Sequence, residues 1–395
     1  MRGRALQKDH HIYERLRRHL DRQAIGFPAS RDGAALRILK HIFSPEEAQV
    51  ATGLSERHEP VDILYERLGQ IVPSPEDLEQ VLDRMLKKGG IEVKVENGRR
   101  YYANTPLVVG MYELQIGRLT PEFLHDFKVY TSGALFGLEF LGTALPQMRT
   151  IPVERSLRPL HGVSSFDEVA VLLAQAPGPF VVLECICRMK KRMEGQACQV
   201  TDRKETCLGF GSIARTVLEG GNGRTIDRSE ALTIIRANQK DGLVLQPSNT
   251  EESAFICSCC GCCCGMLQLH RSLPRPADFW SSNFFAVVDP SLCNGCGICQ
   301  RRCQVDAVVV TRPKEPARVD AARCLGCGQC VNACPQQAIA LCKKPHQNTP
   351  PATREDLHAH LKANRRGPLG KAALAGKLAI DMLRTRNINL FKKNS

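Results

Sequence analysis

The sequence predicts a multidomain α+β fold, and three observations along the chain indicate it. Helix-start signals and a hairpin turn occur within residues 31–112. Short apolar strands alternate with helices within residues 161–281, which also carry ten of the 19 cysteines. Two copies of one cysteine run lie within residues 282–345. A chain of 395 residues has room for two or three such domains.

These shifts in composition divide the chain into six segments. We expect a basic N-terminal arm at 1–30, a helical domain with a hairpin at 31–112, a helix and connector at 113–160, a cysteine-rich metal-binding domain at 161–281, a domain with two cysteine runs at 282–345, and a basic tail at 346–395.

The first predicted domain is built from helices that end in a hairpin. Apolar spacing and start signals predict helices over Ala34–Phe43, from the capping box of Ser44 and Glu47, over Val61–Leu68 and over Pro75–Lys88. Asn97-Gly98 between two apolar runs predicts a tight β-turn. This pattern resembles a winged helix-turn-helix.

A winged helix often binds DNA, but the charges here argue against that role. The helix that would enter the major groove carries carboxylates at its start, which phosphates repel; they are Glu76, Asp77, Glu79 and Asp83. We therefore favour a protein-contact or dimerisation role, and nucleic-acid binding stays open but is not favoured. The net charge of +13 lies partly at the two ends of the chain, where solvated surface is the simpler explanation.

Helices and strands alternate through the middle of the chain, which predicts a cysteine-rich α/β middle region. We expect one long helix from Pro121 to about Leu141, a connector at 146–159, and a further helix opened by a capping box of Ser165 and Glu168. Strands are expected at 180–183 and 243–245, and helices at 211–219 and 228–240. Two histidine pairs, 10–11 and 358/360, are expected at the surface, the first in a flexible start.

Eight cysteines near the C-terminal end repeat the spacing C-x2-C-x2-C-x3-C. The first run is Cys293, Cys296, Cys299 and Cys303, and the second is Cys324, Cys327, Cys330 and Cys334. This spacing is the ligand run of bacterial two-cluster ferredoxins. Pro335 follows the second run, whereas Gln304 stands at the matching place in the first. Paired zinc sites are the alternative, but they rarely use this spacing.

Residues from about 284 to 341 therefore resemble a bacterial 2[4Fe–4S] ferredoxin domain. In such domains the fourth cysteine of each run binds the cluster of the other run. The resemblance implies two [4Fe–4S] clusters, one held by Cys293, Cys296, Cys299 and Cys334, and the other by Cys324, Cys327, Cys330 and Cys303.

Ten more cysteines lie in the middle domain and predict at least one additional centre, an iron–sulfur cluster or zinc. They are Cys185, Cys187, Cys198, Cys207, Cys257, Cys259, Cys260, Cys262, Cys263 and Cys264. Cys257, Cys260 and Cys263 have cubane spacing and would need one remote thiolate. A second cluster could use Cys259 with Cys262 or Cys264. Two alternatives stay open, namely zinc bound by the four upstream cysteines and a redox-active thiol pair.

The whole pattern also resembles a family of cytosolic iron–sulfur proteins with a winged-helix start, a cysteine-dense middle and a ferredoxin end. That resemblance rests on Cys185-x-Cys187-Arg188, the 257–264 run and the C-terminal repeat, and it implies no substrate. The start of the chain lacks a secretory pattern, and no apolar run is long enough for a membrane span, so we expect a cytoplasmic protein with reduced thiols.

No nucleotide-binding or nucleophile motif occurs in the sequence, and we name no catalytic residue. We expect an electron-transfer protein that relays single electrons through two clusters and a further cysteine-ligated centre, with redox proteins as partners and a homodimer left open. It would be an electron carrier or oxidoreductase component more than a stand-alone enzyme. The alternatives are a redox-sensing DNA-binding regulator and an oxidoreductase that uses the middle centre.

Overall fold

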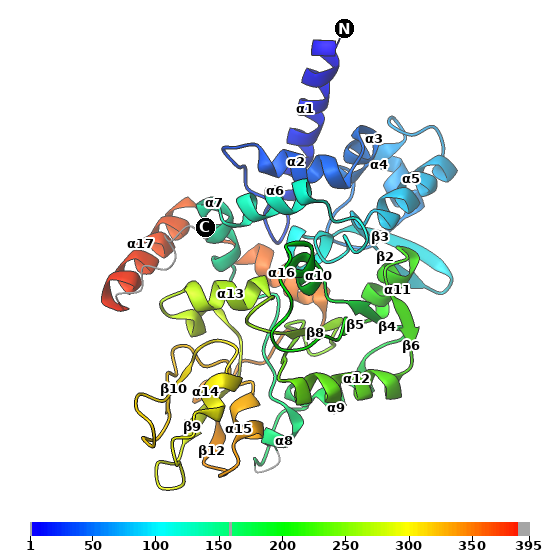
Figure 1. The fold of residues 1–395 in the computed structure, drawn as a ribbon. Helices are drawn as coiled ribbons and strands as arrows, with labels where there is room; N and C mark the ends of the chain where they lie inside the picture. Colours follow the sequence, from blue (N-terminus) through cyan, green and yellow to red (C-terminus); the bar gives the residue numbers. More distant parts are fainter. Residues whose placement is uncertain (1, 158–159, 386–395) are drawn as a thin grey trace.

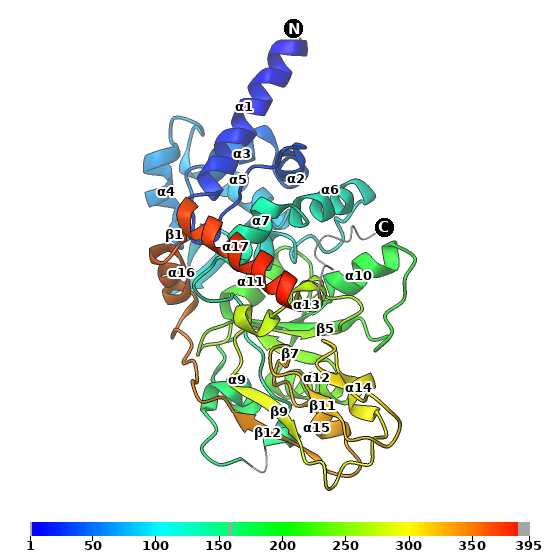
Figure 2. The ribbon, with the colours of Figure 1, turned by 90° about the vertical axis from the view of Figure 1, so that its left-hand side faces the viewer.

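The computed structural model describes residues 2–157 and 160–385, and these residues form three stacked parts (Figures 1 and 2). A mainly helical part lies at one end, a five-stranded sheet lies in the middle, and the region of the two cysteine runs lies at the other end. The molecule thus mixes helices and sheets, as the sequence predicts. Within the described ranges, every helix is too short or too polar to cross a lipid bilayer.

The first part packs helices around one apolar core that also includes a small sheet. Tyr13 and Leu16 of the first helix, Ile38 and Leu82 of later helices, and Tyr102 of the hairpin are all buried in this core. Its elements are α1 (Arg2–Leu20), α2 (Ala34–Ile42), α3 (Pro45–Ala51), α4 (Val61–Leu68), α5 (Pro75–Lys87), α6 (Pro121–Thr131), α7 (Ala134–Leu141), β1 (Glu59–Pro60), β2 (Ile91–Glu96) and β3 (Arg99–Asn104).

Local signals set several of these elements. The Ser44 hydroxyl accepts a hydrogen bond from the Glu47 amide, and the Glu47 carboxylate accepts one from the Ser44 amide, which confirms the predicted capping box. The hairpin is also confirmed, because Asn97 and Gly98 both have positive φ (51° and 77°), as a two-residue turn between β2 and β3 requires.

The long helix predicted from Pro121 to Leu141 is wrong, because it is two helices. α6 ends at Thr131, and Gly133 takes an extended conformation (ψ 139°) before α7 begins. Glycine gains little from staying helical, so the chain can turn there. The capping box predicted at Ser165 is also wrong, since residues 165–167 form a single 3₁₀ turn and the Asp167 carboxylate instead pairs with Arg149 at 3.2 Å.

Within the described residues, the segments predicted as a basic arm and a basic tail both form helices. The start forms α1, which includes the histidine pair at 10–11. The tail forms α16 (Arg354–Ala363) and α17 (Pro368–Thr385), and Arg354 donates to the buried Glu92 carboxylate of β2 at 2.8 Å. His358 is buried rather than exposed, so its predicted surface position is wrong. Residues 386–395 of the predicted tail lie outside the described residues.

The middle part is an antiparallel sheet with strand order β6-β4-β5-β8-β7, so the α/β arrangement expected for this region is wrong, because every strand pair in it is antiparallel. One face packs against α9 and α12, and the other packs against α11, which also contacts β2 of the first part. The elements are α8 (Glu154–Leu157), α9 (Val169–Gln175), β4 (Phe180–Glu184), α10 (Ile186–Met193), β5 (Glu205–Phe210), α11 (Gly211–Glu219), β6 (Arg224–Ile226), α12 (Arg228–Asp241), β7 (Val244–Pro247), β8 (Phe255–Cys259) and α13 (Gly265–Ser272).

The last sheet region repeats one unit twice, as the two cysteine runs do. The outer strands β9 and β12 pair antiparallel, and the inner strands β10 and β11 pair antiparallel. The two short helices, α14 and α15, contact each other. The elements are β9 (Phe284–Val288), α14 (Ile298–Arg302), β10 (Val308–Val309), β11 (Arg318–Val319), α15 (Gln329–Ala333) and β12 (Ile339–Lys343).

Candidate metal centres

Each run of the C-terminal repeat curls around its cysteines through glycines in left-handed conformation. Gly297 and Gly328, at the starts of α14 and α15, have φ of 71° and 72°. A Cβ on Gly295 would lie 2.5 Å from the Glu315 carbonyl oxygen, so only glycine fits against that backbone. The cysteines before and after these glycines therefore face inward from a tight turn.

The first three cysteines of one run and the last cysteine of the other line a single cavity. Its walls include Cys293, Cys296 and Cys299 together with Cys334, which comes from the end of α15. Cys303, the last cysteine of the first run, lies instead near the second run. Burial, together with the nearby Cys303 and Cys324, raises the pKa of Cys327 to about 12.

The donors around these sulfurs fit bound thiolates. Backbone amides donate to Cys324 Sγ from Ala286 (3.4 Å), to Cys303 Sγ from Ala307 (3.2 Å) and to Cys293 Sγ from Ala317 (3.4 Å). Such N–H groups stabilise sulfur that carries negative charge. Burial alone favours the neutral thiol, so thiolates at these positions would need a bound cationic centre to be stable. The residues present therefore fit iron–sulfur clusters.

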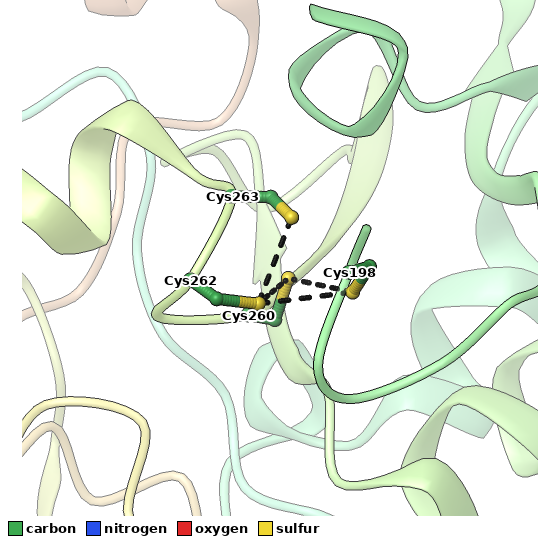
Figure 3. Close-up of side chains that lie close together, drawn as sticks. All are labelled: Cys198, Cys260, Cys262 and Cys263. Carbon is green, nitrogen blue, oxygen red and sulfur yellow. Dashed lines mark hydrogen bonds between the residues drawn. The ribbon is translucent and has the colours of Figure 1, made fainter. Parts of the chain in front are cut away.

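Four cysteines of the middle part form a compact group, the thiol quartet, which consists of Cys198, Cys260, Cys262 and Cys263 (Figure 3). All four Sγ atoms lie within 4.8 Å of one another. Cys262 Sγ lies 3.5 Å from Cys260 Sγ, 3.6 Å from Cys263 Sγ and 3.7 Å from Cys198 Sγ. The hydrogen bond from the Cys263 thiol, followed by the charge of Arg188, lowers the pKa of Cys260 to about 5.

The other six middle cysteines form a second, wider group, the six-thiol group, on the α11 side of the sheet. Each thiol shifts the pKa of the next in a closed order, so the six are neighbours; the order runs Cys185, Cys187, Cys264, Cys259, Cys257, Cys207 and back to Cys185. No three of these Sγ atoms lie within 4.8 Å of one another. The group is therefore too wide for a single ion bound by three or four of its thiols.

Sheet register and two helix starts bring the six-thiol group together. Leu208 pairs with Ile256, so the same register sets Cys207 opposite Cys257 on adjacent antiparallel strands. Cys259 is two residues further along β8 and faces the same side. Cys185 and Cys264 are the N-cap residues of α10 and α13. Neither cap side chain accepts a hydrogen bond from its own helix, and the pKa of Cys264 lies well above its usual value, because the hydrogen bond from Cys187, which lowers it, is outweighed by Cys259 and burial.

Arg188 is a buried cation between the two cysteine groups. It is 1% exposed, and its guanidinium donates to Thr206 Oγ1 (2.5 Å), the Ser258 carbonyl (3.0 Å) and Cys260 Sγ (3.9 Å). Among the described residues, no carboxylate pairs with it. Hydrogen bonds from Cys187 and Cys207 hold the pKa of Cys185 well below its usual value, and the Arg188 charge adds to this effect. A buried arginine needs anionic neighbours, and here only the thiols supply them.

These groupings differ from those that the sequence spacing suggested. Cys257 lies in the six-thiol group, apart from Cys260 and Cys263, because β8 continues through Cys259 and alternates its side chains. The proposed cubane at 257, 260 and 263 is therefore not assembled. The four upstream cysteines do not form one zinc site either, since Cys198 joins the thiol quartet and the other three join the six-thiol group.

The sequence places Arg188 next to the cysteines, in the pattern Cys185-x-Cys187-Arg188, but does not indicate that it is buried. The sequence does set Arg188 apart, because it follows Cys187 directly. In the structure, the other basic residues of the same helix, 190–192, instead pair with partly exposed carboxylates. The sequence also indicates no role for Gln304, which accepts a hydrogen bond from the amide of Gly261, on the turn that carries three cysteines of the thiol quartet.

Comparison with known families gives one match in this region. Residues 285–335 match the family model of a 4Fe-4S dicluster domain. This supports a ferredoxin-like iron–sulfur domain near the C-terminus, over a small part of the chain. A search of curated proteins found nothing similar.

Proposed function

We propose that this protein transfers single electrons through two [4Fe–4S] clusters in residues 282–345 and through a further cysteine-ligated centre at the six-thiol group. One observation carries the proposal. The duplicated β–α–β unit lines one cavity with Cys293, Cys296, Cys299 and Cys334, which is the mixed ligand set that two-cluster ferredoxins use. The clusters, when bound, supply one-electron redox chemistry.

The chain's own groups prepare both cluster pockets for this role. Cys299, Cys324 and Cys330 are buried, so their pockets hold little water. Cys324 accepts hydrogen bonds from two backbone amides, those of Ala286 and Gly326, both at 3.4 Å. Hydrogen bonds to sulfur and exclusion of water are the two means by which a protein sets the potential of such a cluster.

Packing of the middle part against the cluster domain supports a connection between the centres. Gln329, in the helix of the second run, donates to the Leu243 carbonyl at 2.7 Å, and Arg302, in the helix of the first run, donates to the Asp241 carbonyl at 3.0 Å. Gln329 is buried at this contact. A fixed contact of this kind keeps the distance between two redox centres constant.

The regulator hypothesis has less support from the charges of the first part. Arg100 of the hairpin pairs with Asp83 at 2.7 Å and with Glu219 of α11 at 2.5 Å. The Val93 amide of the same hairpin donates to Thr216 of α11 at 3.0 Å. A hairpin held this way by the middle part has its cations neutralised, which disfavours phosphate contact. We therefore keep a protein-contact role for this winged-helix-like domain.

The direct test is anaerobic purification of the full chain, with iron and sulfide quantitation and a coulometric reduction followed by electron paramagnetic resonance. We expect about eight iron and eight sulfide from the two clusters, and at least two one-electron reduction steps. Any iron bound at the six-thiol group adds to this number. A protein that stays colourless and free of iron after reconstitution contradicts the proposal.

A further inference from the structure

We propose that the thiol quartet binds one metal ion tetrahedrally, with zinc or a single iron as the ion, and that this ion fixes the turn on which the cluster domain docks. The inference does not depend on the electron-transfer proposal, since it concerns a different set of cysteines.

The spacing of the four sulfurs matches one ion and does not match a cubane. Four sulfurs about 2.3 Å from one tetrahedral zinc ion lie about 3.8 Å apart. Four of the six Sγ–Sγ distances, at 3.5, 3.6, 3.6 and 3.7 Å, are close to that value, and the other two pairs lie within 4.8 Å. In a [4Fe–4S] cluster each cysteine binds a different iron, so the thiolates must lie further apart. A disulfide is also excluded, because its sulfurs would lie about 2.05 Å apart.

The elements that carry the thiol quartet explain this compact geometry. Cys260, Cys262 and Cys263 lie on the turn between β8 and α13, and Cys198 comes from the irregular loop between α10 and β5 (Figure 3). Three ligands therefore belong to one short turn and the fourth to a distant segment. Cys260 and Cys263 are buried, whereas Cys198 and Cys262 are partly accessible. A metal ion can enter from that accessible side.

Charge favours an ion at this place. Arg188 already supplies one positive charge at 3.9 Å from Cys260 Sγ, which compensates one thiolate. The remaining thiolates need further positive charge in a site that is mostly buried, and a divalent ion supplies it. Tetrahedral sulfur ligation of this kind is typical of zinc and of iron.

The neighbours of the thiol quartet give the ion a structural consequence. Gly261 lies between two of the ligands, and its amide donates to Gln304 Oε1 at 2.9 Å. Gln304 follows Cys303 directly and stands where the second run has Pro335. A Cβ on Gly261 would collide with the Gln304 carbonyl, so the two segments are in close backbone contact. The ion would hold this turn in the shape that meets the cluster domain, because it also ties in the loop of Cys198.

The test is metal analysis of the full chain, expressed with added zinc chloride and purified anaerobically, with four samples compared. We expect about one zinc per chain in the unchanged protein. Cys262→Ser should lose most of that zinc without changing iron or sulfide, and Cys262→His should retain it because histidine is also a zinc ligand. Cys342→Ser is the matched control, since Cys342 is a free, half-buried cysteine outside both groups.

The outcomes separate this inference from its alternatives. A single iron that replaces zinc, and that Cys262→Ser removes without loss of sulfide, supports the same site with a different resident ion. Retained zinc in Cys262→Ser, or a loss of about four iron and four sulfide, overturns the proposal in favour of no site or of a cubane. Unchanged sulfide and iron in Cys262→Ser also show that the variant is folded. A protein that binds zinc but no iron would contradict the electron-transfer proposal and would still support the zinc site.

Discussion

The eight cysteines of the C-terminal repeat and the ten cysteines of the middle part use sulfur in different ways. Among the eight, no three Sγ atoms lie within 4.8 Å of one another, although several line a common cavity. Among the ten, four crowd within 4.8 Å and six form a wide closed group. The difference teaches that thiol spacing, more than cysteine number, distinguishes a site for a cluster from a site for one ion.

The largest effect that tests this comparison is loss of a cluster. Cys327→Ala removes a half-buried thiol beside Cys303 and Cys324, and we expect a loss of about four iron and four sulfide per chain. Chemical quantitation and the electron paramagnetic resonance signal of the reduced protein measure it. Cys342→Ser should lose nothing, and an equal loss in both variants would mean that the effect is not specific to a ligand.

A second prediction concerns the buried cation between the two middle groups. Arg188→Met should lower the free energy of unfolding of the metal-loaded protein by about 3–5 kcal/mol, because it leaves buried anionic sulfur uncompensated. Urea unfolding under anaerobic conditions measures the change. Arg192→Met, on the same helix, is the control: Arg192 is partly exposed and pairs with Glu184, so its effect should stay within about 1 kcal/mol. Equal effects of the two variants would contradict the anionic state of the thiols.

Much of the cluster domain was predictable from sequence because its signals are local. Each run keeps three cysteines and their glycines within a few residues, so spacing alone indicates the turn. The middle groups depend instead on strand register, which sets Cys207 opposite Cys257, and on a loop that brings in Cys198. Spacing along the chain carries no information about either. The hairpin at Asn97-Gly98 was predictable for the same local reason, whereas the packing of α16 against β2 was not.

A third prediction is a pH effect near the start of the cluster domain. Burial, with a contribution from Arg323, lowers the pKa of His270 to about 3, and its ring lies edge-on to Trp280 at 4.9 Å. The unfolded histidine takes up a proton near pH 6.5, whereas the folded one stays neutral. The contribution of neutral His270 to the free energy of unfolding is therefore complete above pH 6.5 and is lost as the pH falls towards the folded pKa. Between pH 7 and pH 5 the loss should be about 2 kcal/mol.

The measurement is urea unfolding at several pH values, followed by fluorescence of Trp280, the single tryptophan. His270→Phe should remove most of this loss, because phenylalanine does not titrate. The pH dependence of this variant is the quantity of interest, so a uniform change in stability does not affect the test. If the free energy of unfolding of His270→Phe still fell with pH as it does in the unchanged protein, His270 would not be the source of the pH dependence.

The smallest expected effect concerns the contact between the middle part and the C-terminal repeat. Gln304→Ala removes the acceptor for the Gly261 amide and should cost about 1 kcal/mol. Hydrogen exchange of the peptide that contains residues 260–264 should then quicken about fivefold. Gln347→Ala, at an exposed position, is the control and should leave exchange in this peptide unchanged. Unchanged exchange in Gln304→Ala would mean that the contact does not hold the turn.

X-ray absorption at the iron and zinc edges of one anaerobic sample tests the central claim most directly, because it measures the neighbours of each metal. The account predicts an iron edge with both sulfur and iron neighbours, as clusters require, and a zinc edge with only four sulfurs at about 2.3 Å. Iron without iron neighbours would contradict the clusters of the C-terminal repeat. Zinc bound by oxygen or nitrogen would contradict the thiol quartet.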